Sequence, residues 1–391
     1  MNIVEAIFSV DLRFGGTSRA ALDLAAVMAG RGHRVTLLTA NDTDVPESWR
    51  VGAAGCPASV QEPRIAPIIG AGRPSETTMA LLRDADVVHV HAMWELYNAR
   101  VASLCRKIGT PYIVTPHGML DDWCMAQSAW KKRLHMRLIG RRMLESAALV
   151  HCTAAAELAQ SKKWFPRGQG CVVPNLMDLA PYRALPGPEE ARARWPRLSK
   201  HGVRLLFLSR VNAKKGVEHL IDATAVLVRE GLDVLAMVAG PADPGYGEVL
   251  LARAKAAGIA DRVEFLGHVG GTLKTSLLEA CDMMVIPSSQ ENFGFVFFEA
   301  LAAGLPVVTT NLVDTCQELA SSGGAVIVSQ DGESVARGIH EVLSWRTERE
   351  SRMKAAREWV FQELDPSAVS ARFEEMYASA ASMRGRSLEG P

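Results

Sequence analysis

Short apolar runs alternate with longer segments whose apolar residues recur every three to four positions, and this pattern extends over most of the chain. The short runs have the length of buried strands, and the longer segments have the period of amphipathic helices. Alternation of this kind is typical of a parallel sheet with helices on both faces. In the first half it predicts strands at Ile3–Val10, Val35–Thr39, Val87–His91, Tyr112–Thr115, Leu149–Thr153 and Cys171–Val173.

Between several of these strands the pattern predicts helices, at Ser18–Gly30, Tyr97–Gly109 and Ala154–Lys162. The stretch Asn41–Ser75 is rich in glycine, proline and alanine and has a weak period, so we expect it to be irregular. The alternation stops around residues 179–202, where Pro181–Pro188 contains three prolines and a glycine. Such a cluster indicates an interdomain linker.

The alternation then restarts, with strands predicted at Val203–Leu208, Val234–Ala239, Val263–Leu266, Met283–Ile286, Val307–Thr309 and Ala325–Val328. Helices are predicted at Val217–Glu230, Gly247–Ala257, Leu273–Ala280, Val296–Ala303 and Ser334–Ser344. A chain of 391 residues is long for a single core. We therefore expect two doubly wound α/β domains, residues 1–178 and 203–364, which face a central cleft of the kind where ligand sites preferentially form.

Composition narrows the class of protein. The chain is 48% hydrophobic and 22% charged, and its formal net charge of zero gives no support for a nucleic-acid partner. Its seven cysteines include no C-x-x-C pair, which favours reduced thiols in a cytoplasmic protein. Met1 leads directly into a strand-like run, and no apolar stretch approaches the ~20 residues that span a bilayer. We expect a cytoplasmic protein that is at most attached to the inner face of the cell membrane.

Two carboxylates, Glu291 and Glu299, bracket a strand-to-helix corner that follows Met283–Ile286. Ligands of open α/β sheets bind where strands lead into helices, and a helix N-terminus favours anions. Backbone amides at such a corner suit a phosphate, and the two acids could accept hydrogen bonds from hydroxyl groups. For an isolated pair of acids, two solvated glutamates beside a core helix are the simpler interpretation.

Other candidate residues follow predicted strands in the same way. Gly15 and Gly16 open the first helix, and adjacent glycines let a ligand approach the backbone closely. His117 ends the strand Tyr112–Thr115, whereas His89 and His91 are interpreted as packed structural residues. No histidine pair has a helical metal-ligand spacing with a third partner nearby, so no metal site is predicted.

In the second half, Arg210 and Lys215 lie on the loop after the strand Val203–Leu208, and Gly240 ends the next strand. An arginine fork and a lysine point charge neutralise a diphosphate well, although solvated loop cations are the simpler reading of such a pair. The D-x-D at Asp42–Asp44 is interpreted as loop acids rather than a metal site, because about one such triplet is expected by chance. We therefore expect activity without a divalent metal or any other cofactor.

Taken together, the motifs resemble those of retaining glycosyltransferases of the GT-B fold, glycosyltransferase family 4. The resemblance runs through most of the chain and is most specific at Ser209–Ala223 and at Pro287–Val308. Val173–Asp178 is similar to the family's hinge segment, but Leu176 replaces its glycine. The stretch Thr115–Asp121 resembles bacterial members that build exopolysaccharide or lipopolysaccharide. The resemblance also implies that a closing helix, residues 365–382, crosses back to the first domain.

The family resemblance assigns a role to each matching residue. Arg210 and Lys215 would bind the donor diphosphate and stabilise the leaving nucleotide. Glu299 would bind the ribose hydroxyls, and His117 would contact the transferred sugar near its anomeric carbon. Glu291, Asn292, Phe293 and Gly294 would hold the donor sugar, and Gly15 and Gly16 would leave room for phosphate and acceptor. Gly240 is a further donor-binding candidate. No carboxylate need act as a covalent nucleophile, so the two-carboxylate glycosidase scheme does not apply.

The segment Trp130–Leu144 carries six lysines and arginines, no acid, and apolar residues at helical spacing. A basic amphipathic helix suits an anionic membrane surface, near a lipid-linked acceptor. Equally, its apolar residues could pack on the domain core and leave a basic solvent face. The membrane-surface candidates are Lys131, Lys132, Arg133, Arg137, Arg141 and Arg142.

These observations predict a retaining, metal-independent glycosyltransferase that moves a sugar from a nucleotide-diphosphate donor to a surface glycan. One alternative is a nucleotide-sugar epimerase or hydrolase of the same fold. Another is a catalytically silent scaffold in polysaccharide assembly. The shape of the binding pocket determines which donor sugar, which base (uracil or guanine) and which acceptor are used. Sugars that differ by a single hydroxyl group leave no difference in the sequence motifs, so the motifs do not identify them.

Overall fold

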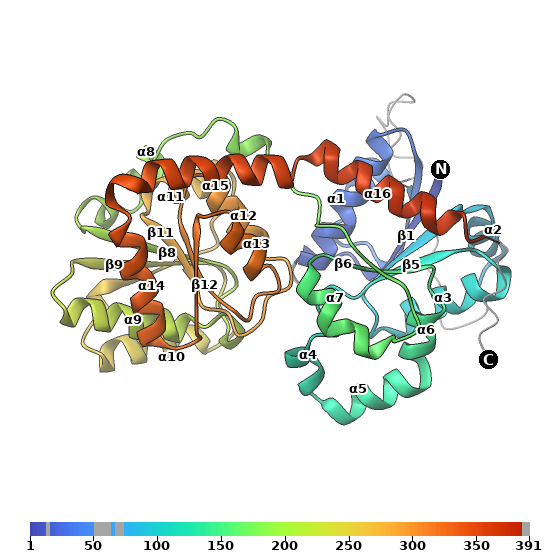
Figure 1. The fold of residues 1–391 in the computed structure, drawn as a ribbon, viewed down its shortest axis with the longest axis horizontal. Helices are drawn as coiled ribbons and strands as arrows, with labels where there is room; N and C mark the ends of the chain where they lie inside the picture. The colour runs from blue at the N-terminus through green and yellow to red at the C-terminus, as the bar shows by residue number, and fades with distance from the viewer. Residues whose placement is uncertain (13–15, 51–63, 67–73, 385–391) are drawn as a thin grey trace. The chain divides into compact units, whose positions relative to one another are not determined.

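The computed structural model describes residues 1–12, 16–50, 64–66 and 74–384. The chain forms two compact units, and each is described here by itself. The first comprises Met1–Met177 together with the C-terminal segment from Pro366, and the second comprises Asp178–Asp365. Figure 1 shows that each unit consists of a sheet covered by helices.

The first unit is built on a parallel seven-stranded sheet in the order β3-β2-β1-β4-β5-β6-β7. Its strands are β1 (Asn2–Ser9), β2 (Arg34–Asn41), β3 (Arg64–Ala66), β4 (Val87–His91), β5 (Tyr112–Thr115), β6 (Leu149–Cys152) and β7 (Gly170–Val172). The order reverses at β1, which pairs with both β2 and β4. The predicted strands and the doubly wound fold are confirmed, whereas β3 lies in the stretch that was expected to be irregular.

Helices cover both faces of this sheet. They are α1 (Gly16–Gly30), α2 (Glu76–Asp84), α3 (Leu96–Ile108), α4 (Asp122–Ala126), α5 (Ala129–His135), α6 (Arg141–Glu145), α7 (Ala155–Ser161) and α16 (Pro366–Ala381). One core cluster joins α1 and α16 to the sheet, and the other joins α3 and α6 to its opposite face. The C-terminal helix therefore completes the first unit, and its Phe373 and Tyr377 are fully buried there.

The second unit has a parallel six-stranded sheet in the order β10-β9-β8-β11-β12-β13. The strands are β8 (Val203–Leu208), β9 (Val234–Ala239), β10 (Val263–Gly267), β11 (Met283–Ile286), β12 (Val307–Thr310) and β13 (Ala325–Val328). The order reverses between β8 and β11, which are neighbours although two strands separate them in sequence. Both sheets thus have the doubly wound topology in which ligands bind at the carboxyl ends of the strands.

The helices of the second unit are α8 (Glu189–Arg194), α9 (Val217–Arg229), α10 (Tyr246–Ala256), α11 (Gly271–Ala280), α12 (Phe295–Ala302), α13 (Cys316–Ser321), α14 (Gly332–Ser344) and α15 (Arg349–Glu363). The strands β8, β9, β11 and β12 are buried along almost their whole length, as expected for a sheet covered on both faces. Two loops leave the carboxyl ends of β8 and β11, and the candidate site lies on them.

Candidate functional site

The loop after β8 and the loop after β11 are held against each other by their backbones. Gly216 has a φ of +70°, and a Cβ atom there would lie 2.1 Å from the carbonyl oxygen of Pro287. The amide of Ser289 donates a hydrogen bond of 2.8 Å to the carbonyl of Lys214. Only glycine fits the first of these contacts, which explains the glycine after Lys215.

This contact brings Lys215 and Glu291 together, although they are 76 residues apart in sequence. The ammonium of Lys215 forms an ion pair with the Oε2 atom of Glu291. Lys215 is 8% exposed, and burial together with the positive charges of Lys214 and Arg210 lowers its pKa to about 7. Arg210 lies exposed on the same loop. The buried lysine depends on the carboxylate as its counter-charge, because an unpaired buried charge is costly.

A third loop, which follows β12, fixes the corner that begins at Glu291. The amide of Asp314 donates to the carbonyl of Glu291 at 2.9 Å, and the Asn292 amide group contacts the Asp314 carboxylate at 3.2 Å. The hydroxyl of Thr315 donates to the carbonyl of Phe293 at 2.9 Å. These bonds hold the corner in a rigid shape before any ligand binds.

The helix α12 starts at this corner because Gly294 adopts a left-handed conformation with a φ of +69°. Glu299 lies in the second turn of α12 and is only 4% exposed. Its Oε1 atom pairs with Nζ of Lys274 in α11 at 2.9 Å. The sequence analysis did not identify Lys274. Its only signal was a lysine near the start of a helix that follows a strand.

Gly240, a predicted donor-binding residue, has a structural reason to be glycine. Its φ is +140°, and a Cβ atom would lie 1.8 Å from the carbonyl oxygen of Ser209. Its amide donates to the carbonyl of Gly267 at 2.7 Å. The residue therefore packs the end of β9 against the loop that carries Arg210, and its role in donor binding stays a prediction.

In the first unit, His117 lies on the turn that follows β5 at the carboxyl edge of the sheet and has a positive φ of +53°. The following amide, that of Gly118, donates to Oε1 of the buried Glu157 at 2.6 Å, which fixes the turn. Gly16 is the first residue of α1 at the same edge, and Gly15 lies outside the described residues. A histidine with a positive φ is uncommon and requires support from its surroundings.

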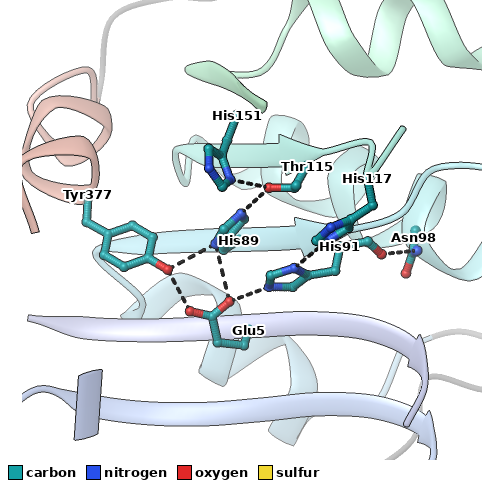
Figure 2. A network of polar contacts seen from close by, with 8 residues as sticks. All are labelled: Glu5, His89, His91, Asn98, Thr115, His117, His151 and Tyr377. Carbon is teal, nitrogen blue, oxygen red and sulfur yellow. Dashed lines mark hydrogen bonds and ion pairs between the residues drawn. The ribbon is translucent and has the colours of Figure 1, made fainter. Parts of the chain in front are cut away.

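That support comes from a buried polar network (Figure 2). His117 Nε2 lies 3.1 Å from His91 Nδ1, and His91 Nε2 lies 2.8 Å from Oε2 of Glu5. Tyr377 of α16 contacts both Glu5 and His89, at 2.7 and 2.9 Å. Burial and the neighbouring histidines lower the pKa of His117 and of His89 well below the usual value. His89 and His91 are packed residues, as expected, and His91 also supports His117.

Glu5, His89 and His91 each place one ligand atom within 4.8 Å of the others, a spacing that a metal ion could use. The sequence analysis missed this group because the third member comes from a neighbouring strand, where Glu5 pairs with His89 in register. His89 Nδ1 contacts the Tyr377 hydroxyl at 2.9 Å, and His91 Nε2 and Glu5 Oε2 contact each other at 2.8 Å. Independence of metal remains a prediction.

The acids of the D-x-D triplet are engaged within the protein. Asp42 forms an ion pair with Arg50, and Asp44 accepts a hydrogen bond of 2.7 Å from the amide of Leu12. These contacts are those of loop acids.

The basic segment is helical over its whole length, as α5, a π-helical turn (Met136–Gly140) and α6. Met136, Met143 and Leu144 are buried in the core. Three other apolar side chains, at a spacing of four residues, face outward: Trp130, Leu134 and Leu138, which are 68%, 48% and 67% exposed. One apolar stripe of the segment therefore packs in the core and a second is exposed, and attachment to a membrane surface stays a prediction.

None of the helices in the described part of the chain combines the length and the apolar composition needed to cross a bilayer. None of the six described cysteines forms a disulfide.

Each unit matches a known domain family. Residues 191–359 match the family "Glycosyl transferases group 1", and residues 15–176 match the "Glycosyl transferase 4-like domain". The first match contains Arg210, Lys215, Glu291 and Glu299, and the second contains His117.

Similar proteins and structures point the same way. A phosphatidyl-myo-inositol mannosyltransferase of Mycobacterium leprae is 27% identical, and the match covers 94% of each chain. A D-inositol 3-phosphate glycosyltransferase of Actinosynnema mirum is 30% identical, over 63% of this chain and 58% of its own. The crystal structure of Anabaena HepE with UDP has the same fold, with a TM-score of 0.76, 19% identity, and coverage of 97% of this chain and 100% of its own.

Proposed function

Because this chain is a glycosyltransferase with the GT-B fold, we propose that it uses a nucleotide-diphosphate sugar and transfers the sugar with retention of anomeric configuration. The acceptor is a glycan or lipid-linked sugar of a bacterial surface polysaccharide, on the cytoplasmic side of the membrane. Neither a metal nor another cofactor takes part.

The observation that carries this proposal is the ion pair of the buried Lys215 with Glu291 at the start of α12. A partly exposed carboxylate is a replaceable counter-ion, and a diphosphate that reaches Lys215 can take its place. Arg210, exposed on the same loop, adds a second cation for the charge that develops on the leaving diphosphate. Glu291, once released, is left to accept hydrogen bonds from sugar hydroxyls.

The two glutamates serve best as hydrogen-bond acceptors. Each forms an ion pair with a lysine, Glu291 with Lys215 and Glu299 with Lys274. Carboxylate oxygens placed beside ammonium groups in this way suit the acceptance of hydrogen bonds from hydroxyl groups. In this mechanism the acceptor attacks from the side that the diphosphate leaves, and the leaving phosphate takes the acceptor's proton.

The donor can be identified with a thermal-shift screen of UDP- and GDP-sugars. UDP is a reasonable first ligand, since related structures were solved with UDP and with UDP-glucose. We expect one nucleotide family to raise the melting temperature. If no nucleotide or nucleotide sugar changes it, a silent scaffold becomes the better explanation. Epimerised sugar formed from donor alone would instead identify an epimerase.

The exposed stripe of Trp130, Leu134 and Leu138 supports attachment to an anionic membrane surface. Exposed cations, among them Lys131, flank the stripe. A groove of about 350 Å³ adjoins it and is lined in part by Leu96, Leu138, Arg100, Arg106 and Arg142. Apolar side chains beside arginines fit the interface of an anionic lipid layer, where a lipid-linked acceptor would lie.

Co-sedimentation with vesicles that contain anionic lipid tests this part of the proposal. Replacement of Lys131, Lys132 and Arg133 by glutamate should abolish binding, and so should replacement of Trp130 and Leu134 by serine. Charge reversal at Lys354, Arg346 and Arg352 in the second unit is the matched control and should leave binding intact. The membrane proposal fails if the wild-type chain does not bind, or if the first reversal has no effect.

A further inference from the structure

Figure 2 shows a direct contact of 3.4 Å between His89 Nδ1 and Glu5 Oε2, and a longer hydrogen-bonded path from His151 to His117. That path of seven hydrogen bonds begins at the carbonyl of Val173, and every side chain along it before His117 is buried. From the carbonyl it runs through His151, Thr115, His89, Tyr377, Glu5 and His91, with donor–acceptor distances of 2.7, 2.7, 2.6, 2.9, 2.7, 2.8 and 3.1 Å. These residues come from β1, β4, β5, β6 and α16.

The end of this path that reaches His117 has a defined direction. The Tyr377 hydroxyl donates to Oε1 of the fully buried Glu5. The other carboxylate oxygen, Oε2, accepts from Nε2 of His91 at 2.8 Å.

The same direction determines which nitrogen of His117 carries hydrogen. An imidazole ring that donates from one nitrogen accepts at the other, so His91, which donates from Nε2, accepts at Nδ1. His117 Nε2 lies 3.1 Å from that acceptor and is therefore the donor.

We propose that Glu5 and Tyr377 are positioning residues that hold His117 in the tautomer protonated at Nε2, so that Nδ1 presents a lone pair to a substrate hydroxyl. Nδ1 has no hydrogen-bond partner among the described residues. The proposal gives this end of the site a chemical preference: it accepts a hydrogen bond from a hydroxyl and disfavours an anion. The identity of that hydroxyl as a sugar hydroxyl rests on the proposed function, whereas the tautomer does not.

Long-range ¹H–¹⁵N NMR of the histidine side chains in the full-length, ligand-free chain measures the tautomer directly. The variant His117→Gln identifies the His117 signals by their loss. We expect the wild-type ring to show a protonated Nε2 and an unprotonated Nδ1. Protonation at Nδ1 in the wild-type spectrum would overturn the proposal, whatever the variants do and whatever the donor proves to be.

Three substitutions separate positioning from general packing. Glu5→Leu removes the acceptor of His91, so the bond between His91 and His117 can reverse and both tautomers should be present. Glu5→Gln keeps an acceptor oxygen for His91 and can donate from its amide group to Tyr377, so it should restore the single tautomer. Thr115→Val breaks the path at its other end. It leaves intact the contacts from Tyr377 through Glu5 and His91 to His117, and the wild-type tautomer should persist.

A purely structural role would make Glu5→Leu and Thr115→Val alike in the spectrum, and that result would contradict the proposal. A mixed tautomer in Glu5→Gln would also contradict it, because a carboxylate charge would then be needed. Spectra recorded with EDTA and with added zinc exclude the remaining alternative. A change in the signals of His89 and His91 on zinc addition would identify a metal site in place of the proton network.

Discussion

The substitution Lys215→Met most sharply tests the assignment of the β8 loop to the donor diphosphate. Methionine retains most of the side-chain length and removes the charge. The lysine is 8% exposed and pairs with Glu291, whose side chain is 21% exposed. In the variant the carboxylate can therefore turn toward water, and the buried charge disappears.

The structure gives the size and sign of two opposite effects. Lowering the pKa of Lys215 from 10.5 to about 7 corresponds to roughly 5 kcal/mol of unfavourable free energy for the charged form in the folded protein. The variant should therefore be at least as stable as the wild type. A hydrogen bond between a charged lysine and a phosphate contributes about 1.5–3 kcal/mol, so the affinity for a nucleoside diphosphate should fall by about tenfold to a hundredfold.

Two measurements on the same samples test this prediction. Calorimetric titration with UDP and GDP gives the affinity, and thermal unfolding without ligand gives the stability. Lys214→Met is the matched control, because it removes the same charge from the same loop at a half-buried position. We expect the control to retain affinity to within a few-fold. Wild-type affinity in Lys215→Met would refute the placement of the diphosphate, and a large loss of stability would refute the argument about its buried charge.

Four further predictions concern the same enzyme. The diphosphate favours the ammonium form of Lys215, whose pKa is about 7. Nucleotide binding above that pH should therefore take up a proton, and the affinity should fall as the pH rises from 7 to 9. Calorimetric titrations in two buffers of different ionisation enthalpy measure the proton uptake, and equal heats in the two buffers would count against it. For the ligand-free protein the sign is opposite: between the folded value near 7 and the unfolded value of 10.5, the unfolded chain binds more protons, so Lys215 makes the free energy of unfolding rise with pH. Glu299→Gln removes the counter-charge of the partly buried Lys274. It should lower the affinity for UDP by about tenfold and the free energy of unfolding by about 1–3 kcal/mol. If Glu299 binds the ribose, the loss of affinity should be smaller for 2′-deoxy-UDP than for UDP, and an equal loss for both would contradict that role. Treatment with EDTA should leave turnover unchanged, and activity that returns only with magnesium would end the metal-independent mechanism.

Periodic patterns in the sequence predicted the two sheets well, because buried parallel strands are short apolar runs bounded by turns. The prediction was poorer where composition hid structure. In the stretch rich in glycine and proline, β3 is only three residues long and pairs with β2, and a single short edge strand has no period of its own.

Several residues of the candidate site could not be found by position along the chain. Glu5 was read as part of an apolar strand, and its importance appears only when the register places it opposite His89. Lys274 lies 25 residues before its partner Glu299, on a different helix. Tyr377 joins the network from 372 residues beyond Glu5. Such contacts depend on strand order and helix packing, which periodicity does not specify.

The central claim is that the donor binds with its diphosphate at Lys215 and its ribose at Glu299. A crystal structure of the chain with the nucleotide found in the thermal-shift screen tests it most directly. We predict that a β-phosphate oxygen replaces Glu291 as the partner of the Lys215 ammonium, and that the ribose hydroxyls donate to the Glu299 carboxylate. A nucleotide bound elsewhere, with the pair of Lys215 and Glu291 intact, would contradict the account.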